Sequence, residues 1–223
     1  MKDFEKDFFI SGMAGKIQCY GHRADKNGVF FDQKKVAIIC HPHPQQGGTM
    51  DNKVVTSLMR TYRDLGIDVI RFNFRGVAES EGDFAQGIGE YDDLMAVVRW
   101  VIREFTEYDL LLAGFSFGSS IAARASYSTP GLQHLTLVAP PIERYEYDKN
   151  SCFPVPICVL QGDLDERVNA HGVYDWFNQL QSPGELIRYA EATHFFHGYL
   201  SQIKNDLGQC LLSQLAARSG LSY

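Results

Sequence analysis

The sequence has no apolar run near the roughly 20 residues that a membrane-spanning helix requires. Residues 1–7 are mostly charged and lack the apolar core of a secretory signal peptide. No block of like charges is present either, because the 21 Lys and Arg and the 27 Asp and Glu, with a net charge of −6, are spread along the chain. Without a basic patch, a nucleic-acid partner is not expected. These absences predict a cytoplasmic protein that contacts neither membranes nor nucleic acids.

Cysteine is scarce and forms no motif. The five cysteines are odd in number, widely spaced and never in a Cys-x-x-Cys pair. This pattern favours reduced core thiols over a disulfide framework or a zinc site. The glycines around Gly87 and Gly89 follow a loop rather than a strand, so they are not a dinucleotide fingerprint. We expect neither a metal nor a cofactor.

What the sequence does contain is enough apolar residues for one core. Its 223 residues are 45% apolar, and we expect a single domain over residues 1–223. Predicted strands cover 8–10, 15–20, 36–40, 69–74, 110–113, 135–139, 157–160 and 186–189. Predicted helices cover 52–65, 91–105, 119–127, 168–180 and 199–217. The later strands are uniformly apolar and alternate with helices, which indicates an α/β fold, a mainly parallel sheet covered by helices on both faces.

The run from Leu110 to Gly118 is the most informative local signal. Four apolar residues lead into Gly114-Phe115-Ser116-Phe117-Gly118, and a small-residue helical pattern follows. This is the strand–turn–helix setting of a nucleophile elbow, in which glycines on either side let strand and helix pack without a Cβ clash. The pattern predicts an exposed serine hydroxyl at a strand tip and makes Ser116 the candidate nucleophile.

Other chemically active side chains also follow predicted strands. In a parallel sheet, the ligand site lies beyond the carboxyl ends of the strands. The residues that fall at such ends are His43, Gln45, Arg75, Ser116, Asp163, Asp165 and His194. Their convergence predicts one site at this edge of the sheet.

A serine needs a base to take its proton and an acid to orient the base. Ser116 is followed by Asp163 and Asp165 after one strand, and by His194 and His197 after the last. The order Ser, Asp, His is that of α/β-hydrolase sheets. The two aspartates have the same strand parity, so alternation does not separate them.

Five segments resemble small bacterial α/β-hydrolases related to dienelactone hydrolases. They are HPHPQQGGTMDNKVV (41–55), RFNFRGVAESEG (71–82), GFSFG (114–118), QGDLDERV (161–168) and ATHFFHG (192–198). The resemblance implies an α/β-hydrolase fold of about eight strands. It places the acid at Asp165 and the base at His194, leaving Asp163 as a loop acid and His197 as a supporting or helix-capping residue. Residues 140–154 are too few for the helical lid that many relatives carry, so a fold without a cap domain is expected.

An acyl-transfer site also needs N–H donors for the oxyanion. One is expected to be the backbone N–H of Phe117, directly after the nucleophile. The second should come from the loop after strand 36–40, where Pro42 and Pro44 have no N–H. His43 and Gln45 remain. Most of the enzymes that this chain resembles carry His-Gly where it has His43-Pro44, so the resemblance favours Gln45, the residue after this pair, with His43 as the alternative.

Several other residues near these motifs have alternative interpretations. His41 and His43 could suggest a metal site, but no carboxylate or cysteine lies at ligand spacing, so a stiff active-site wall is favoured. Cys40, at a strand end, is interpreted as a core thiol. Arg75 and Glu81 could bind a charged substrate, but an internal ion pair that fixes their loop is favoured, with Glu90, Asp92 or Asp93 as further candidate partners. Side chains expected to line the substrate site are His43, Phe115 and Phe195, with Tyr145, Tyr147, Phe153, Phe117 and Phe196 at its mouth.

Together these features predict a serine hydrolase that cleaves small or medium carboxylic esters, or thioesters, through an acyl-enzyme. A peptidase or amidase and an acyltransferase would use the same triad. A non-enzymatic binding protein is disfavoured because all three triad residue types are present. The expected partner is a small-molecule ester, and the expected state is a monomer or homodimer.

Overall fold

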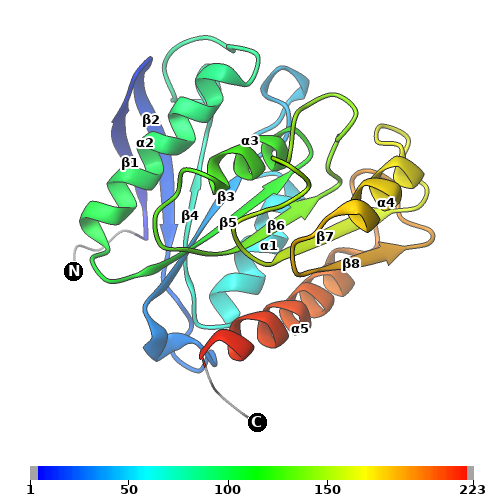
Figure 1. The fold of residues 1–223 in the computed structure, drawn as a ribbon. Helices are drawn as coiled ribbons and strands as arrows, with labels where there is room; N and C mark the ends of the chain where they lie inside the picture. Colours follow the sequence, from blue (N-terminus) through cyan, green and yellow to red (C-terminus); the bar gives the residue numbers. More distant parts are fainter. Residues whose placement is uncertain (1–4, 220–223) are drawn as a thin grey trace.

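The computed structural model describes residues 5–219 of the chain, and the side chains of residues 5–216. It contains one eight-stranded sheet of order β1-β2-β4-β3-β5-β6-β7-β8 (Figure 1). The strands are β1 (Asp7–Gly12), β2 (Gly15–His22), β3 (Lys35–Cys40), β4 (Asp68–Phe72), β5 (Asp109–Phe115), β6 (Leu132–Val138), β7 (Ile157–Gly162) and β8 (Gly184–Tyr189). β1 and β2 form an antiparallel hairpin, β2 pairs antiparallel with β4, and all other pairs are parallel. The predicted fold class is confirmed.

Five α-helices cover the two faces of the sheet. They are α1 (Lys53–Asp64), α2 (Ile88–Glu104), α3 (Phe117–Ser126), α4 (Ala170–Gln179) and α5 (Leu200–Ser219). Helices α2, α3 and α4 supply one hydrophobic core, and α1 and α5 supply the other. Figure 1 shows these two layers on opposite sides of the sheet. Helix packing on both faces explains why the strands read as apolar runs.

The central strands are buried on both sides, and their residues alternate between the two cores. In β5, Leu110 and Leu112 face the α2–α3–α4 core, whereas Leu111, Ala113 and Phe115 face the α1–α5 core. β5 pairs with β3 on one side and with β6 on the other, so its carboxyl end lies in the middle of the sheet edge. The serine that follows β5 is therefore carried by a strand that is covered on both faces and paired on both edges.

Most element boundaries differ from the prediction by one to three residues, and three of these differences lie near the site. β4 ends at Phe72 rather than at Phe74. α2 begins at Ile88, three residues early, because the carboxylate of Glu90 accepts the backbone N–H groups of Ala85 and Gly87 and so caps the first turn. α3 begins at Phe117, directly after the elbow serine. The residues that Glu90 caps at the start of α2 lie in a segment for which sequence periodicity alone predicts a loop.

The segment between β6 and β7 contains no helix, in agreement with the expected absence of a cap domain.

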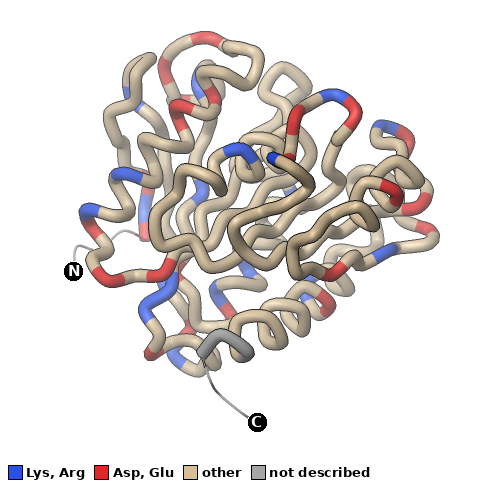
Figure 2. Tube along the Cα trace, viewed as in Figure 1, with Lys and Arg blue, Asp and Glu red and all other residues tan. Residues whose placement is uncertain are grey.

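Acidic and basic residues are interspersed along the trace (Figure 2), as the sequence indicates. Between residues 5 and 219, no helix is long and apolar enough to cross a membrane. Four cysteines are buried, but Cys152 is exposed, so the expectation of core thiols is wrong for that residue.

Candidate active site

Ser116 lies at a sharp turn between β5 and α3. Its backbone has φ 52° and ψ −122°, a conformation that L-residues rarely adopt. The turn directs the backbone from the sheet directly into the first turn of α3. The Ser116 side chain is partly exposed, whereas its neighbours Phe115 and Phe117 are buried. This is the geometry expected from the nucleophile-elbow motif.

The two glycines of the motif are required by close backbone packing. A Cβ on Gly114 would lie 2.3 Å from the carbonyl oxygen of Gly118. A Cβ on Gly118 would lie 2.4 Å from the carbonyl oxygen of His41 and 2.5 Å from that of Cys40. Real Cβ atoms do not approach backbone this closely, so the turn, and the contact of α3 with the end of β3, admit only glycine at these positions.

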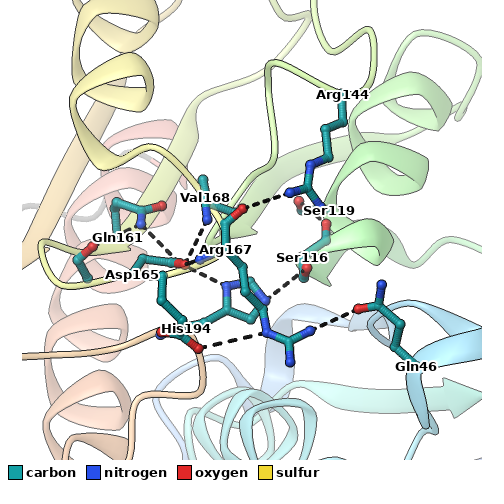
Figure 3. A network of polar contacts seen from close by, with 11 residues as sticks. Gln46, Ser116, Ser119, Arg144, Gln161, Asp165, Arg167, Val168 and His194 are labelled. Atoms are coloured by element: carbon teal, nitrogen blue, oxygen red, sulfur yellow. Dashed lines mark hydrogen bonds and ion pairs between the residues drawn. The ribbon is translucent and has the colours of Figure 1, made fainter.

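Ser116, His194 and Asp165 form a continuous hydrogen-bonded series (Figure 3). Nε2 of His194 lies 3.1 Å from Oγ of Ser116, and Nδ1 of His194 lies 2.8 Å from Oδ2 of Asp165. The His194 residue is 3% exposed and the Asp165 side chain is 0% exposed. Three residues predicted from separate motifs therefore meet above the carboxyl ends of β5, β7 and β8.

The carboxylate of Asp165 is fully occupied by donors. Its Oδ1 accepts the backbone N–H groups of Arg167 and Val168, each at 2.8 Å. Its Oδ2 accepts from His194 and from Nε2 of Gln161, the latter at 3.2 Å. Burial alone would raise the pKa of Asp165, but the bond with His194 and the backbone donors hold it below its ordinary value. The carboxylate therefore stays ionised beside the imidazole.

Asp163, the alternative acid, points elsewhere. It forms an ion pair of 2.6 Å with Arg188 and accepts a hydrogen bond from the hydroxyl of Tyr174. The Arg188 bond holds the pKa of Asp163 below its ordinary value. His197, the alternative base, is exposed, and its ring contacts that of Phe195. The structure thus brings together Asp165 and His194 and leaves the two alternatives on the surface.

The two predicted oxyanion donors differ in their surroundings. Phe117 is the first residue of α3, where a backbone N–H has no intrahelical acceptor. The N–H of Gln45, however, donates to Nδ1 of His43 at 3.2 Å, inside the short 3₁₀ helix Pro44–Gln46. Among the described residues, the N–H of His43 has no hydrogen-bond acceptor. The geometry therefore favours the N–H of His43 over that of Gln45 as an available donor, and the role of either in an oxyanion hole stays a prediction.

The aromatic residues of the site divide into supporting and exposed groups. Phe115 is 0% exposed and packs against the ring of His194 at 5.1 Å between centroids. The predicted substrate contact of Phe115 is wrong, because its side chain is buried in the α1–α5 core and a substrate cannot reach it. Phe195 and His43 keep part of their surface exposed. Of the side chains expected at the mouth, four are almost wholly buried: Phe117, Tyr147, Phe153 and Phe196.

His41 is a structural residue rather than an open ligand. It is 0% exposed, its Nδ1 donates to the carbonyl of Pro42, and its Nε2 accepts the N–H of Phe74. Burial lowers the pKa of His41 to about 4. Within the described residues, no group of three or more His, Cys, Asp or Glu could hold a metal ion. Cys40 is fully buried, and burial raises the pKa of its thiol.

The favoured ion pair of Arg75 is present, with Asp93 of α2 as its partner. Two bonds, of 2.7 and 3.0 Å, join the guanidinium to the carboxylate. Asp93 also accepts the backbone N–H of Arg75, so the pair fixes the loop after β4. Glu81 instead accepts the backbone N–H of Lys16. Arg75 is therefore committed to structure and is not available to a substrate.

The sequence analysis missed four residues around the site. Gln161 contacts Asp165, Glu166 accepts the backbone N–H of His194, and Ser119 contacts the backbone of Ser116. Arg167 donates to Oε1 of Gln46 across the front of the site, as Figure 3 shows. Gln161 did have a signal, since it is the polar residue of an otherwise apolar strand end. The other contacts join residues from separate loops or lie within the elbow, and hydrophobic periodicity does not predict such contacts.

Comparisons with known proteins agree with this fold. No family model matches the sequence. A serine hydrolase homologue from Coxiella burnetii is 39% identical, with a TM-score of 0.87, over 94% of this chain and 98% of that one. A serine hydrolase without a lid from Xanthomonas campestris is 36% identical, with a TM-score of 0.88, over 95% of both chains. An uncharacterized protein of Rickettsia prowazekii (strain Madrid E) is 33% identical over 187 residues, 80% of this chain and 79% of that protein.

Proposed function

The chain belongs to the α/β serine hydrolases without a lid, and from that membership we propose that it hydrolyses small or medium carboxylic esters through an acyl-enzyme on Ser116. The observation that carries the proposal is the position of the His194 ring, with Nε2 at 3.1 Å from Ser116 Oγ and Nδ1 at 2.8 Å from Asp165. A base at this distance can accept the serine proton as the hydroxyl attacks a carbonyl.

The proposed reaction has two halves. Ser116 Oγ bonds to the ester carbonyl carbon while its proton passes to Nε2 of His194, giving a tetrahedral oxyanion. The bond to the alcohol oxygen then breaks, and His194 returns the proton to the leaving alkoxide. Water attacks the acyl-enzyme by the same route in reverse, and the carboxylic acid leaves. Asp165 holds the imidazole with its Nδ1 protonated and stabilises the imidazolium that forms twice per turnover.

The backbone N–H groups of Phe117 and His43 are the proposed oxyanion donors. His43 replaces Gln45 in this role because the Gln45 N–H already donates to the His43 ring. One such donor lowers the activation free energy by about 2.7–4 kcal/mol in enzymes of this type. A structure of the fluorophosphonate adduct tests the choice, because the phosphonyl oxygen should lie within hydrogen-bond reach of His43 N and out of reach of Gln45 N.

The substrate class is proposed from the shape of the entrance. The segment between β6 and β7 has no helix to sequester a substrate. Four partly exposed rings offer apolar contacts near the serine: Phe195 packs on Phe115, Tyr145 packs on Phe117, and His43 packs on Phe84. An open aromatic rim suits esters and thioesters of modest size. A relationship to dienelactone hydrolases, with serine in place of their cysteine nucleophile, is part of the same proposal.

Labelling with a fluorophosphonate probe tests the nucleophile directly. The wild-type chain should be labelled once, on Ser116, and should hydrolyse p-nitrophenyl esters in a chain-length series. Ser116→Ala should lose both labelling and hydrolysis while keeping its fold. Acyl-CoA thioesters and anilides of the same acyl groups rank thioester and amide bonds against esters. A wild-type chain that is neither labelled nor active on any of them contradicts the proposal.

A further inference from the structure

The strained backbone of Ser116 is held on both sides: its N–H donates to the carbonyl oxygen of Val138 at 2.8 Å, and its carbonyl oxygen is bonded by Ser119. The carbonyl oxygen of Ser116 accepts two hydrogen bonds from Ser119, one from its backbone N at 2.9 Å and one from its Oγ at 2.5 Å. Ser119 is 0% exposed, so water does not compete for these bonds. The Ser119 hydroxyl therefore gives the shorter of the two bonds that orient the Ser116 carbonyl.

That hydroxyl is itself oriented by Tyr147. The hydroxyl oxygens of Ser119 and Tyr147 lie 2.7 Å apart. A carbonyl oxygen can only accept, so the Ser119 proton points to Ser116 and the Tyr147 hydroxyl donates to Ser119 Oγ. Burial raises the pKa of Tyr147 well above its ordinary value, so the phenol keeps the proton that this bond requires. The direction of both bonds is thus determined.

Tyr147 belongs to the irregular segment between β6 and β7 that borders the site. It is 4% exposed, and its ring packs edge-on against Trp176 of α4 at 5.8 Å between centroids. The side chain is therefore anchored by packing, and its hydroxyl is presented to the elbow from a fixed position. The two hydrogen bonds connect this border segment to the backbone of the serine.

We propose that Ser119 and Tyr147 are positioning residues that act as one unit, holding the Ser116 carbonyl so that Oγ stays aimed at His194. The inference rests on the proposed role of Ser116 as nucleophile. Neither side chain touches the reacting atoms. Without the two bonds the strained peptide is free to relax, and a shift of Oγ by a fraction of an ångström lengthens its 3.1 Å contact with His194.

The test compares Tyr147→Phe, Ser119→Ala and the double variant with two matched controls. Tyr127→Phe removes a hydroxyl that also joins α3 to the same segment, through the carbonyl of Cys152 and the N–H of Lys149. Ser126→Ala removes a buried hydroxyl that bonds the carbonyl three residues earlier in α3, as Ser119 does. Neither control contacts Ser116 through these bonds.

Two rates and one stability are measured for each variant: fluorophosphonate labelling of Ser116, kcat and KM on one p-nitrophenyl ester, and urea unfolding. Rates are expressed per folded protein. Tyr147→Phe and Ser119→Ala should each lower kcat and the labelling rate by about tenfold or more, with little change in KM. In the Ser119→Ala background, Tyr147→Phe should add less than about twofold, because the connection is already broken. Both controls should label at the wild-type rate.

Two outcomes overturn the inference. One is labelling of Tyr147→Phe at the same rate as Tyr127→Phe, which would reduce Tyr147 to a packing residue. The other is a double variant whose rate loss is the product of the two single losses, because two independent residues behave in that way. Failure of the wild-type chain to be labelled would instead contradict the proposed function. The two failures are therefore distinguishable.

Discussion

The side-chain amide of Gln161 donates to Oδ2 of Asp165, the same oxygen that accepts from His194. Gln161 is 0% exposed, and its own Oε1 has no hydrogen-bond partner in the described structure. An unpartnered buried oxygen costs stability. The position of the side chain therefore depends on the hydrogen bonds that its amide nitrogen donates. Gln161 is therefore a neutral donor that stabilises the negative charge of Asp165 beside its bond with the imidazole.

Replacing Gln161 by Leu should therefore move the pH profile of the enzyme. Loss of the donor destabilises the ionised form of Asp165, so the pair formed with His194 takes up a proton more readily. The acidic limb of the kcat/KM profile should shift to higher pH by up to about one unit. Gln214→Leu is the matched control, since Gln214 of α5 also has a buried Oε1 without a partner but donates to the carbonyl oxygen of Ile157, away from the triad. An unchanged acidic limb in Gln161→Leu would show that the amide only packs.

Asp165→Asn and Asp163→Asn should separate the two aspartates. Asn at 165 leaves the geometry nearly intact but favours the wrong imidazole tautomer, so kcat should fall by about 10⁴-fold. Asp163 forms its ion pair with Arg188, whose side chain is about half exposed, and water screens such a pair, so its loss should change stability little. Ester hydrolysis by Asp163→Asn should stay near the wild-type rate. Equal losses in the two variants would contradict the assignment of the acid.

The buried imidazole of His41 should make the protein less stable in mild acid. Its pKa is lowered to about 4 in the folded chain, whereas an unfolded histidine titrates near 6.5. Between these values the unfolded chain binds more protons, so the free energy of unfolding falls as pH decreases through this window. The contribution is up to about 3 kcal/mol. His41→Gln keeps an acceptor for the N–H of Phe74 and has no proton to bind.

Urea unfolding at a series of pH values measures the effect. His41→Gln should lose less stability than the wild type between about pH 7 and about pH 4. His22, whose pKa is also lowered to about 4 by burial and by Arg71, contributes equally to both proteins. The difference between the two curves therefore isolates His41. Parallel curves would mean that the imidazole accepts a proton in the folded state without cost.

The elements and the site were predictable where the local sequence determines the backbone. Gly114 and Gly118 flank Ser116 because β5 and α3 touch, and that close approach can be inferred from spacing alone. Burial of β5 on both faces predicts the parallel sheet, and the sheet predicts that Ser116 and His194 share one edge. Asp163 and Asp165 are different, since both lie beyond the strand in a turn, where alternation no longer applies.

The remaining parts of the site depend on tertiary contacts that no local pattern encodes. Tyr147 reaches Ser119 from a segment 28 residues away, and its burial follows from packing against α4 rather than from its neighbours. Phe115, which is expected to line the substrate site, is fully buried. The alternation of β5 already placed it with Leu111 and Ala113 in the α1–α5 core. Strand parity, and not adjacency to the nucleophile, therefore decides where the Phe115 side chain lies.

Gly118→Ala tests whether the elbow tolerates any side chain. Its new Cβ would lie within 2.5 Å of two backbone carbonyl oxygens at the end of β3, which sheet pairing with β5 holds in place. The strain can be relieved only by moving the start of α3, which carries the Phe117 N–H and the Ser116 peptide. We expect a loss of about 1–3 kcal/mol of stability and a fall of about 100-fold in fluorophosphonate labelling per folded protein.

Gly208→Ala is the control for this substitution. Gly208 lies inside α5, and a Cβ there would meet nothing within 4 Å. Alanine should therefore raise the free energy of unfolding by about 0.5–1 kcal/mol, because it favours the helix without new contacts. Its labelling rate should equal that of the wild type. If Gly118→Ala is labelled as fast as Gly208→Ala, the contact between α3 and β3 does not set the position of the serine, because the helix can then move without disturbing the hydroxyl.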